Sequence, residues 1–344
     1  MTQPFDISPS LLASLGWSQF FADQSGPGDE GLVPVRIAGV HRSRLMAETG
    51  SGQIRLGLPF QTNTMDFAVG DWVLMDPVTQ VASRRLDRAT VLRRRTESAH
   101  IPQLIAANVD TLFIVTSCND DFNPARLERY LALANEAGTH PVIVLTKVDQ
   151  VADAAPYLAE AQALQRGLAV VTLNAKAADA ATVLAPWCGP GQTVALVGSS
   201  GVGKSTLLNT LADKAPDQAQ ATGSIREDDA KGRHTTTSRS LHAITGGGWV
   251  IDTPGMRTLH VSDVADGLGQ LFAEITELAP LCRFRDCTHA HEPGCAIQAA
   301  VAAGDLSAAR LDRWRKLHEE NLANTPVSTG PRGNKTFAPR GKRR

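Results

Sequence analysis

"GSSGVGKST", residues 198–206, lies between a strand-like run, "QTVALVG", and a helix-like run, "KSTLLNTLAD". It satisfies the pattern G-x-x-x-x-G-K-[ST], in which backbone N–H groups of the loop and of the helix N-terminus converge on an anion. Lys204 is then placed to neutralise the β- and γ-phosphates of a nucleotide, and Ser205 to bind magnesium. A glycine-rich turn without a ligand is the alternative, but the flanking strand and helix argue against it. The expected contacts of this phosphate-binding loop are Gly198, Ser199, Ser200, Gly201, Val202, Gly203, Lys204, Ser205 and Thr206.

The later run "VIDTPG", residues 250–255, predicts a second phosphate-sensing loop. Asp252 ends an apolar strand, where it can hold magnesium through water, and the N–H of Gly255 can meet a γ-phosphate. Between the two loops lies the threonine-rich segment "KGRHTTTSRS" (231–240), which we expect to become ordered around γ-phosphate and magnesium. Its offset from the following strand favours Thr236 as a magnesium ligand, with Thr235 and Thr237 as alternatives.

The nucleobase is indicated by "LTKVDQ", residues 145–150. A carboxylate at Asp149 can accept hydrogen bonds from N1–H and the exocyclic amine of guanine, whereas adenine would leave it unpaired. Lys147 can cover one face of the ring with its aliphatic stem, and Thr146 can tie this loop to the phosphate-binding loop.

A second base-recognition loop, "LNAK" at 173–176, ends the next predicted strand. Its Ala175 N–H can be offered to the guanine carbonyl. Together the two base-recognition loops are expected to contact a guanine nucleotide, GTP or GDP, through Thr146, Lys147, Val148, Asp149, Asn174, Ala175 and Lys176.

From residue 108 onward, apolar strands alternate with helical stretches at 124–137 and 154–166, which is typical of a mostly parallel sheet with helices on both faces. Asn123 is a suitable N-cap for the first helix, and Gly138 a suitable C-terminal stop. The base-recognition loops precede the phosphate-binding loop in the chain. Because ligand loops gather at the carboxyl ends of parallel strands whatever their order in the sequence, we predict a circularly permuted α/β P-loop fold.

Five segments are expected in this chain of 344 residues, whose 42% hydrophobic and 20% charged content suffices for two or three domains. Short β-branched runs separated by Gly, Asn and Pro predict a small all-β barrel. The sequence shows neither a secretory signal nor an apolar run long enough to cross a membrane, so a cytoplasmic protein is expected. The segments are a loosely ordered N-terminal arm at 1–33, the barrel at 34–96, the α/β domain at 97–262, a helical domain at 263–325 and a basic, disordered tail at 326–344.

A metal site is predicted in the helical domain, where three of the five cysteines crowd between 282 and 295. Cys282, Cys287, His289 and Cys295 offer three thiolates and one imidazole, a donor set suited to a closed, tetrahedral structural Zn²⁺ site. His291 competes with His289 as the fourth ligand. Free buried cysteines are the alternative.

Two basic runs stand out against a net charge of −1: "RRLDRATVLRRR" at 84–95 and "GPRGNKTFAPRGKRR" at 330–344. Either can hold the phosphate backbone of a nucleic acid, although a solvated basic face and a frayed tail are the more common origin of such runs.

The motifs "TKVD", "NAK", "GSSGVGKST", "GRHTTT", "DTPG" and "CRFRDCTHAHEPGC" occur in the order seen in the RsgA (YjeQ) family, which the chain resembles over roughly residues 35–320. The resemblance implies an N-terminal OB-fold, a central circularly permuted GTPase domain and a C-terminal zinc domain, with His289 as the histidine ligand. It also implies a GTPase that is stimulated by the small ribosomal subunit and acts late in its maturation. We expect rRNA as its partner and a monomer as its oligomeric state.

The group that positions the attacking water is not given by the usual motif, because Met256 stands where Ras-like enzymes carry a glutamine. His234, directly before the threonines, is the nearest candidate; the alternative is an exposed, RNA-contacting histidine.

Two other functional classes remain as alternatives. A P-loop ATPase or kinase would use the same phosphate-binding loop but has no use for the base-recognition loops. A nucleotide-independent zinc- and RNA-binding module would leave the central region without a role.

Overall fold

The protein is described by a computed structural model, in which it divides into two compact units, residues 1–259 and 260–344. Among the described residues, no helix combines the length and the apolarity needed to cross a bilayer. The structure describes residues 8–94, 102–212, 239–253 and 261–325, together with two short strands at 328–329 and 335–336.

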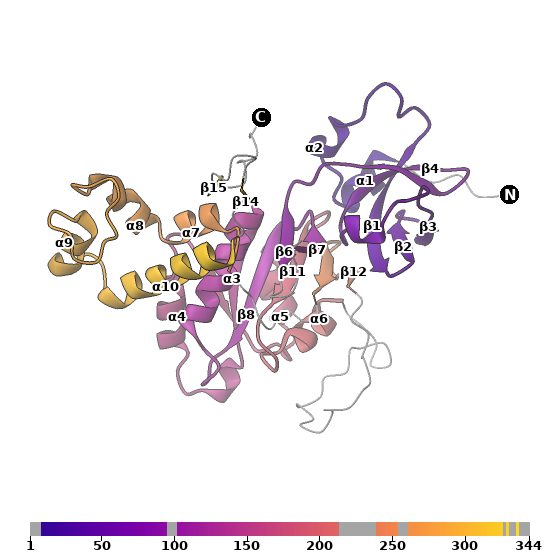
Figure 1. Cartoon of the computed structure of the whole chain (residues 1–344). Coiled ribbons are helices and arrows are strands. Elements are labelled where there is room, and N and C mark those ends of the chain that lie inside the picture. The colour runs from indigo at the N-terminus through magenta and orange to yellow at the C-terminus, as the bar shows by residue number, and fades with distance from the viewer. Residues whose placement is uncertain are drawn as a thin grey trace, which may run out of the picture. The chain divides into compact units, whose positions relative to one another are not determined.

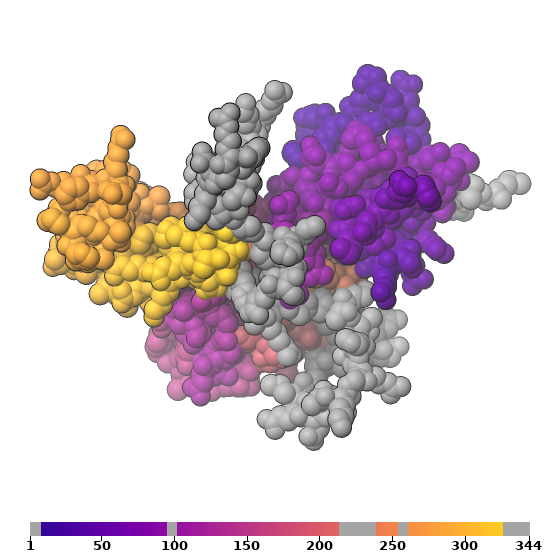
Figure 2. Space-filling view, in the orientation of Figure 1, coloured from indigo at the N-terminus to yellow at the C-terminus, as the bar shows by residue number. Residues whose placement is uncertain are grey.

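After a short N-terminal segment, the first unit forms a five-stranded antiparallel barrel (Figure 1) with a buried apolar core; Figure 2 shows the outer surface of this part in indigo to purple. Its neighbours run in the order β1-β2-β3-β5-β4-β1, and a parallel bridge between Gly57 and Val81 closes it. This is the closed five-stranded barrel expected of an OB-fold. The strands are β1 (Val33–His41), β2 (Arg44–Glu48), β3 (Gln53–Leu56), β4 (Trp72–Asp76) and β5 (Val81–Arg85), with the 3-10 helix η1 (Thr64–Asp66) between β3 and β4.

A mostly parallel sheet forms the rest of this unit, as predicted. Its spatial order is β10-β9-β8-β11-β13-β12, in which only β12 runs antiparallel to its neighbour. The sheet joins the barrel where Gly39 of β1 pairs with Ser240 of β12. The strands are β8 (Thr111–Ser117), β9 (His140–Thr146), β10 (Ala169–Thr172), β11 (Thr193–Val197), β12 (Ser240–Ala243) and β13 (Trp249–Asp252), and the hairpin β6 (Val91–Arg94) and β7 (Gln103–Ala107) precedes them.

The first predicted helix is confirmed as α3 (Pro124–Ala137). Asn123 caps it by accepting a hydrogen bond from Arg126 N at 3.0 Å, and Gly138 ends it with φ +76°. The second helix is shorter than predicted, since α4 spans Ala155–Gln162 and the chain turns at Gly167. The remaining elements are α5 (Ala180–Leu184), α6 (Lys204–Ala212), η2 (Val148–Gln150) and η3 (Ala185–Trp187).

The segment before the barrel is better ordered than the sequence suggested. Leu15 and Phe21 are buried in one cluster with Trp72 of the barrel. Trp17 meets Trp72 edge-on, with 4.9 Å between ring centroids. The expectation of a loosely ordered arm is therefore wrong for residues 8–32, which contain α1 (Pro9–Ser14) and α2 (Gln19–Ala22).

Arg36 joins this arm to both the barrel and the parallel sheet. Its buried guanidinium donates from Nη1 to Leu15 O at 2.6 Å and from Nη2 to Thr193 Oγ1 at 2.8 Å. Burial lowers the pKa of Arg36 to about 10, so the group stays charged at neutral pH. Trp249 of β13 adds a hydrogen bond from Nε1 to Ser14 O at 2.8 Å. The arm therefore fastens the barrel to β11, the strand that leads into the phosphate-binding loop.

Truncating the side chain of Leu15 tests whether the arm belongs to the folded unit. Leu15→Ala is expected to lower the free energy of unfolding by about 2–4 kcal/mol, because it leaves a cavity in a packed cluster. Phe20→Ala is the control, since Phe20 is 44% exposed and its loss should cost less than about 1 kcal/mol. Urea unfolding followed by tryptophan fluorescence measures both. Equally small effects would show that the arm packs loosely.

The second unit is helical, as predicted. Arg310 holds it together: its Nε lies 2.8 Å from Glu274 Oε1, and its guanidinium covers the ring of Phe272 at 4.1 Å. The elements are α7 (Ala265–Leu271), α8 (Ala273–Leu278), η4 (Ala279–Leu281), α9 (Ala296–Ala303) and α10 (Ala308–Asn324), followed by the pair β14 (Ser328–Thr329) and β15 (Lys335–Thr336). The rest of the basic tail lies outside the described residues.

Candidate nucleotide-binding site and metal centre

The predicted loops meet at one edge of the sheet, because each follows a parallel strand. The first base-recognition loop starts at the end of β9, the second follows β10, and the phosphate-binding loop follows β11. Asp252 ends β13, which pairs with β11 in parallel. The carboxyl ends of parallel strands are where open α/β sheets bind ligands.

The phosphate-binding loop requires glycine at its first position. Gly198 has φ +140°, and a Cβ there would lie 2.1 Å from Val115 O of the neighbouring strand. The loop then leads into α6, whose first residue is Lys204. The Lys204 ammonium donates to Gly198 O at 2.8 Å and to Ser199 O, so it lies folded back over the loop. A bound phosphate would present oxygen acceptors of the same kind to this ammonium.

Two hydroxyl groups tie the base-recognition loops to the phosphate-binding segment. Thr146 Oγ1 donates to Val202 O at 2.6 Å, which is the link the sequence suggests for this threonine. Thr210 of α6 donates to Ala175 O at 2.9 Å. Base and phosphate loops therefore hold one another in place across 56 and 35 positions of the chain.

The two base-recognition loops have backbones suited to presenting polar groups. Lys147 adopts a left-handed conformation with φ +59°, and the turn η2 places Asp149 on the surface. In the second loop Asn174 Oδ1 accepts from Lys176 N at 3.0 Å, which fixes the turn around the buried Ala175.

The phosphate-sensing side of the site is described only in part. Asp252 is half-buried and pairs in register with Ser240 of β12. Thr253, which the sequence analysis did not single out, is buried and donates from Oγ1 to Leu196 O at 2.5 Å. Four residues considered for this side, His234, Thr235, Thr236 and Thr237, lie outside the described residues, as do Gly255 and Met256.

The residues that sequence reasoning missed act through the fold rather than through a motif. In the sequence, Thr210 is an ordinary helix residue, and Thr253 is one polar residue of the run "VIDTPG"; their hydrogen-bond partners, Ala175 O and Leu196 O, are known only from the structure. A hydroxyl group one helical turn after a phosphate-binding loop, or directly after its sensing aspartate, is the only signal that the sequence offered for them.

The second unit brings Cys282, Cys287, His289 and Cys295 together, with all four ligand atoms within 4.8 Å of one another. His289 Nδ1 lies 3.5 Å from Cys282 Sγ and 3.6 Å from Cys295 Sγ, and these two sulfurs are 3.8 Å apart. Burial lowers the pKa of His289 and so favours the neutral ring, the form that binds metals. His291 is exposed and does not join the cluster.

The positions of the ligands follow from local structure. His289 is in a left-handed conformation with φ +60°, and its Nδ1 faces Cys282 Sγ and Cys295 Sγ. Cys295 caps α9 by accepting from Gln298 N at 3.4 Å. Burial raises the pKa of Cys287 to about 11, so its thiolate, the form that binds a metal, is favoured only with a cation beside it. This donor set can hold one metal ion.

Comparison with known proteins agrees with this geometry. Residues 85–262 match the RsgA GTPase family. The small ribosomal subunit biogenesis GTPase RsgA of Mesorhizobium japonicum is 67% identical over 337 residues, which is 98% of this chain and 97% of that protein. RsgA 2 of Vibrio vulnificus is 48% identical over 92% of this chain and 89% of its own length.

Solved structures show the same architecture. YjeQ from Thermotoga maritima superposes with a TM-score of 0.63 at 25% identity, covering 85% of this chain and 99% of its own. YloQ, described as a circularly permuted GTPase, gives a TM-score of 0.60 at 23% identity over 88% of this chain and 100% of its own, a likeness of fold alone. With two base-recognition loops, a phosphate-binding loop and Asp252 at one edge of the sheet, a family match over residues 85–262 and a relative that matches nearly the whole length, the chain belongs to the RsgA family of GTPases.

Proposed function

We propose that this protein is a GTPase that binds the small ribosomal subunit and its rRNA and assists a late step of subunit maturation, hydrolysing GTP to GDP and phosphate with stimulation by the subunit. The observation that carries the proposal is the tie between base recognition and phosphate binding through Thr146 and Val202. A kinase or general ATPase would not need that tie. The protein acts as a monomer in the cytoplasm, where ribosomal subunits are assembled.

Each loop has a role in this proposal. Asp149 selects guanine, Lys147 covers its ring, and the Ala175 N–H meets its carbonyl. The phosphate-binding loop and Lys204 hold the β- and γ-phosphates. Ser205 and Thr236 would hold Mg²⁺ directly and Asp252 through water, with Gly255 beside the γ-phosphate; the ion would neutralise charge that develops on the phosphates.

The metal of the second unit is Zn²⁺ in this proposal, with a structural role. Zinc bound at about 2.3 Å to sulfur and about 2.0–2.1 Å to nitrogen separates tetrahedral sulfurs by about 3.8 Å and sulfur from nitrogen by about 3.6 Å. Cys282 and Cys295 show 3.8 Å between their sulfurs, and His289 Nδ1 lies 3.5 and 3.6 Å from them, so these three ligands fit; Cys287 completes the set within 4.8 Å. Four protein ligands leave no open position for a reacting water.

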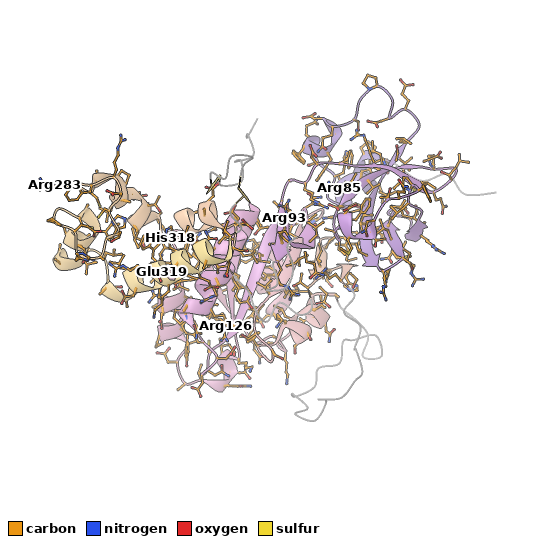
Figure 3. All side chains as sticks on the ribbon, viewed as in Figure 1. Arg85, Arg93, Arg126, Arg283, His318 and Glu319 are labelled. Atoms are coloured by element: carbon orange, nitrogen blue, oxygen red, sulfur yellow. The ribbon has the colours of Figure 1, made fainter. Side chains whose placement is uncertain are left out.

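The arginine run at 84–95 contributes less to RNA binding than its charge suggests. Arg84 is held by Asp29 at 2.6 Å and lowers the pKa of that carboxyl to about 2. Arg88 is held by the fully buried Asp71, also at 2.6 Å. Arg85 and Arg93 are exposed, and they remain available to phosphates (Figure 3).

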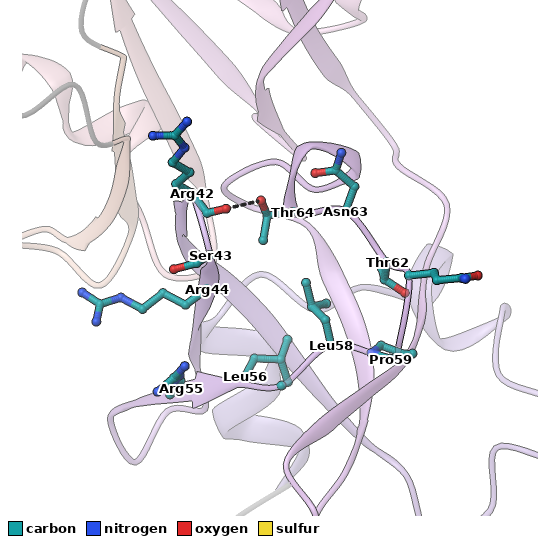
Figure 4. A pocket seen from close by; sticks show the side chains of 12 residues that line it. Arg42, Ser43, Arg44, Arg55, Leu56, Leu58, Pro59, Thr62, Asn63 and Thr64 are labelled. Carbon is teal, nitrogen blue, oxygen red and sulfur yellow. Dashed lines mark hydrogen bonds between the residues drawn. The ribbon is translucent and has the colours of Figure 1, made fainter.

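A stronger candidate surface for RNA lies on the barrel, around a pocket of about 580 Å³ (Figure 4). Arg42, Arg44 and Arg55 lie along one side of it, all exposed, and none of the residues that line it is acidic. The side chains of these arginines make no ion pair within the described part of the chain. Phe60, which is 92% exposed next to the pocket, can stack on an unpaired base.

Phosphate release with GTP and with ATP, each with and without purified small subunits, tests the proposal. We expect the protein to hydrolyse GTP and not ATP. Competing GDP should suppress this hydrolysis, and small but not large ribosomal subunits should accelerate it. ATP turnover would favour the P-loop ATPase or kinase, and no turnover with either nucleotide a binding module.

His234 gives a prediction for the stimulated reaction. His234→Ala is expected to lose most of the subunit-stimulated rate while keeping GTP affinity and subunit binding, because a neutral imidazole can orient the attacking water. Single-turnover hydrolysis at saturating subunits measures the rate. A stimulated rate equal to that of the unmodified protein would place the catalytic group in the RNA or in another residue.

A further inference from the structure

We propose that Arg239, Arg42 and His41 form an anion site that takes a backbone phosphate of rRNA and reports RNA binding to the segment that carries the threonines. The proposal rests on the proposed function, and it adds a specific site to it. The residues lie around a separate pocket of about 300 Å³ between the barrel, the β6–β7 hairpin and the start of β12.

Arg239 is the reason to expect a ligand. Its Nη1 donates to Leu104 O at 3.0 Å, but its Nε is buried and has no hydrogen-bond partner among the described residues. Burial, and then the charge of Arg94, lower the pKa of Arg239. A guanidinium carries five donors, and burying it beside a second cation is costly unless an anion accepts from it.

The pocket offers that anion a polar lining and no competitor. The residues that line it include no aspartate or glutamate, so no carboxylate among them pairs with Arg239. Asn63 and Gln103 add side-chain amide donors to the lining, while Thr64 Oγ1 donates to Arg42 O at 3.3 Å. A phosphate, with several acceptor oxygens and a bidentate fit to guanidinium, satisfies this arrangement better than a single carboxylate would.

The source of the phosphate follows from the neighbouring surface. The smaller pocket shares Arg42, Asn63 and Thr64 with the larger arginine-lined pocket of Figure 4. A nucleic-acid strand bound along Arg44 and Arg55 therefore has a continuous positive path to Arg239. An isolated phosphate ion would use only the smaller pocket.

The position of Arg239 next to β12 connects the phosphate site with the nucleotide site. Arg239 directly precedes β12, where Ser240 pairs with Gly39 of the barrel on one side and with Asp252 of β13 on the other. A phosphate that draws Arg239 toward the barrel acts on the strand between the threonine-rich segment and the phosphate-sensing aspartate. Binding at the barrel can thus reach the nucleotide site through a single residue.

Arg239→Gln removes the charge but keeps a polar side chain. In small-subunit binding measured across salt concentration, the slope of log affinity against log salt should fall by about 0.7–0.9, the share of one phosphate contact. The ratio of subunit-stimulated to intrinsic GTP turnover, at saturating subunits, should fall about tenfold, within the usual range of coupling between sites. Arg239→Lys should keep the slope because it keeps the charge.

Two further variants separate the pockets. Arg42→Gln removes an arginine that lines both pockets, and because Arg42 is exposed, the change does not endanger folding. Its effect on the free energy of subunit binding should be non-additive with that of Arg239→Gln, because both arginines hold one phosphate. Arg55→Gln removes the same charge from the larger pocket alone, so it should lower the slope but not the turnover ratio.

Stimulation of the unmodified protein tests the proposed function, whereas the Arg239 variants test the phosphate site alone. If small subunits fail to stimulate the unmodified protein, the proposed function itself is wrong. If they stimulate it, and Arg239→Gln keeps both slope and ratio, the pocket takes no RNA phosphate and this inference alone is overturned. Fully additive effects of Arg42→Gln and Arg239→Gln would also overturn it.

Discussion

Asp149→Asn is expected to cost the protein about one order of magnitude in GTP affinity and to create affinity for xanthosine nucleotides. In the proposed site the carboxylate would accept two charge-assisted hydrogen bonds from guanine, each worth about 1.5–3 kcal/mol, and an amide would accept only one of them. The amide can instead donate to the extra carbonyl of xanthine. Because Asp149 lies on the surface in this structure, we expect the lower end of that range.

A matched control for this change lies four positions further along the chain. Asp153 is exposed, and its Oδ1 accepts from Ala155 N at 2.9 Å, a role that asparagine can also fill. Asp153→Asn therefore removes the same charge near the same loop and should leave nucleotide affinity unchanged. Titration with fluorescent GTP, GDP and XTP analogues measures both variants. If Asp149→Asn binds GTP with the same affinity as the unmodified protein, Asp149 does not recognise the base.

The site loops could be predicted from the sequence because their chemistry dictates residue types at short spacing. A phosphate-binding loop needs glycine, lysine and a hydroxyl group within nine positions, and Gly198 shows why, since a Cβ there would collide with Val115 O. The ties between loops could not be predicted in the same way. Thr210 meets Ala175 only because β10 and β11 belong to one sheet edge, and the spatial order of strands is not written in any local pattern.

The order of the N-terminal arm could not be predicted, because its short helices are weak on their own and are stabilised by tertiary packing. Helices of six and four residues are too short to be stable alone, so the sequence favoured a loose segment. They are held instead by Trp72 and by the buried guanidinium of Arg36, which come from the barrel. Tertiary packing supplies what helix propensity lacks.

Charge counting failed for a related reason. The run at 84–95 looked like one basic surface, yet Arg84 is paired with a carboxylate 55 positions away and Arg88 with one 17 positions away. Conversely, nothing in the sequence set Arg239 apart from Lys231 and Arg233 in the same polar segment. The buried Nε of Arg239, unpaired among the described residues, became visible only once β7 and the barrel were seen around it.

Cys287→Ala is the second change with a large expected effect. Zinc content, measured by elemental analysis, should fall from about one per chain to a small fraction, because three ligands hold a structural zinc far more weakly than four. The second unit should then unfold at lower temperature, since the free energy of metal binding in such domains is part of their folding free energy. Thermal unfolding with and without a chelator measures this coupling.

Packing alone does not predict the same result, because Cys287 is only half-buried and its side chain fills little of the core. Cys188 provides the control: it is buried, and burial raises the pKa of its thiol to about 12, so it is a packed and unreactive cysteine outside the cluster. Cys188→Ala should lose some stability of the first unit, as a cavity does, and keep its zinc. If the thiols of the second unit were merely structural, the more buried cysteine would give the larger destabilisation and chelator would change neither variant. If the metal stabilises the second unit, Cys287→Ala should lose more stability than Cys188→Ala. A chelator should then lower the unfolding temperature of Cys188→Ala, which keeps its zinc, but leave that of Cys287→Ala unchanged. This combination of results is possible only if metal binding stabilises the fold of the second unit.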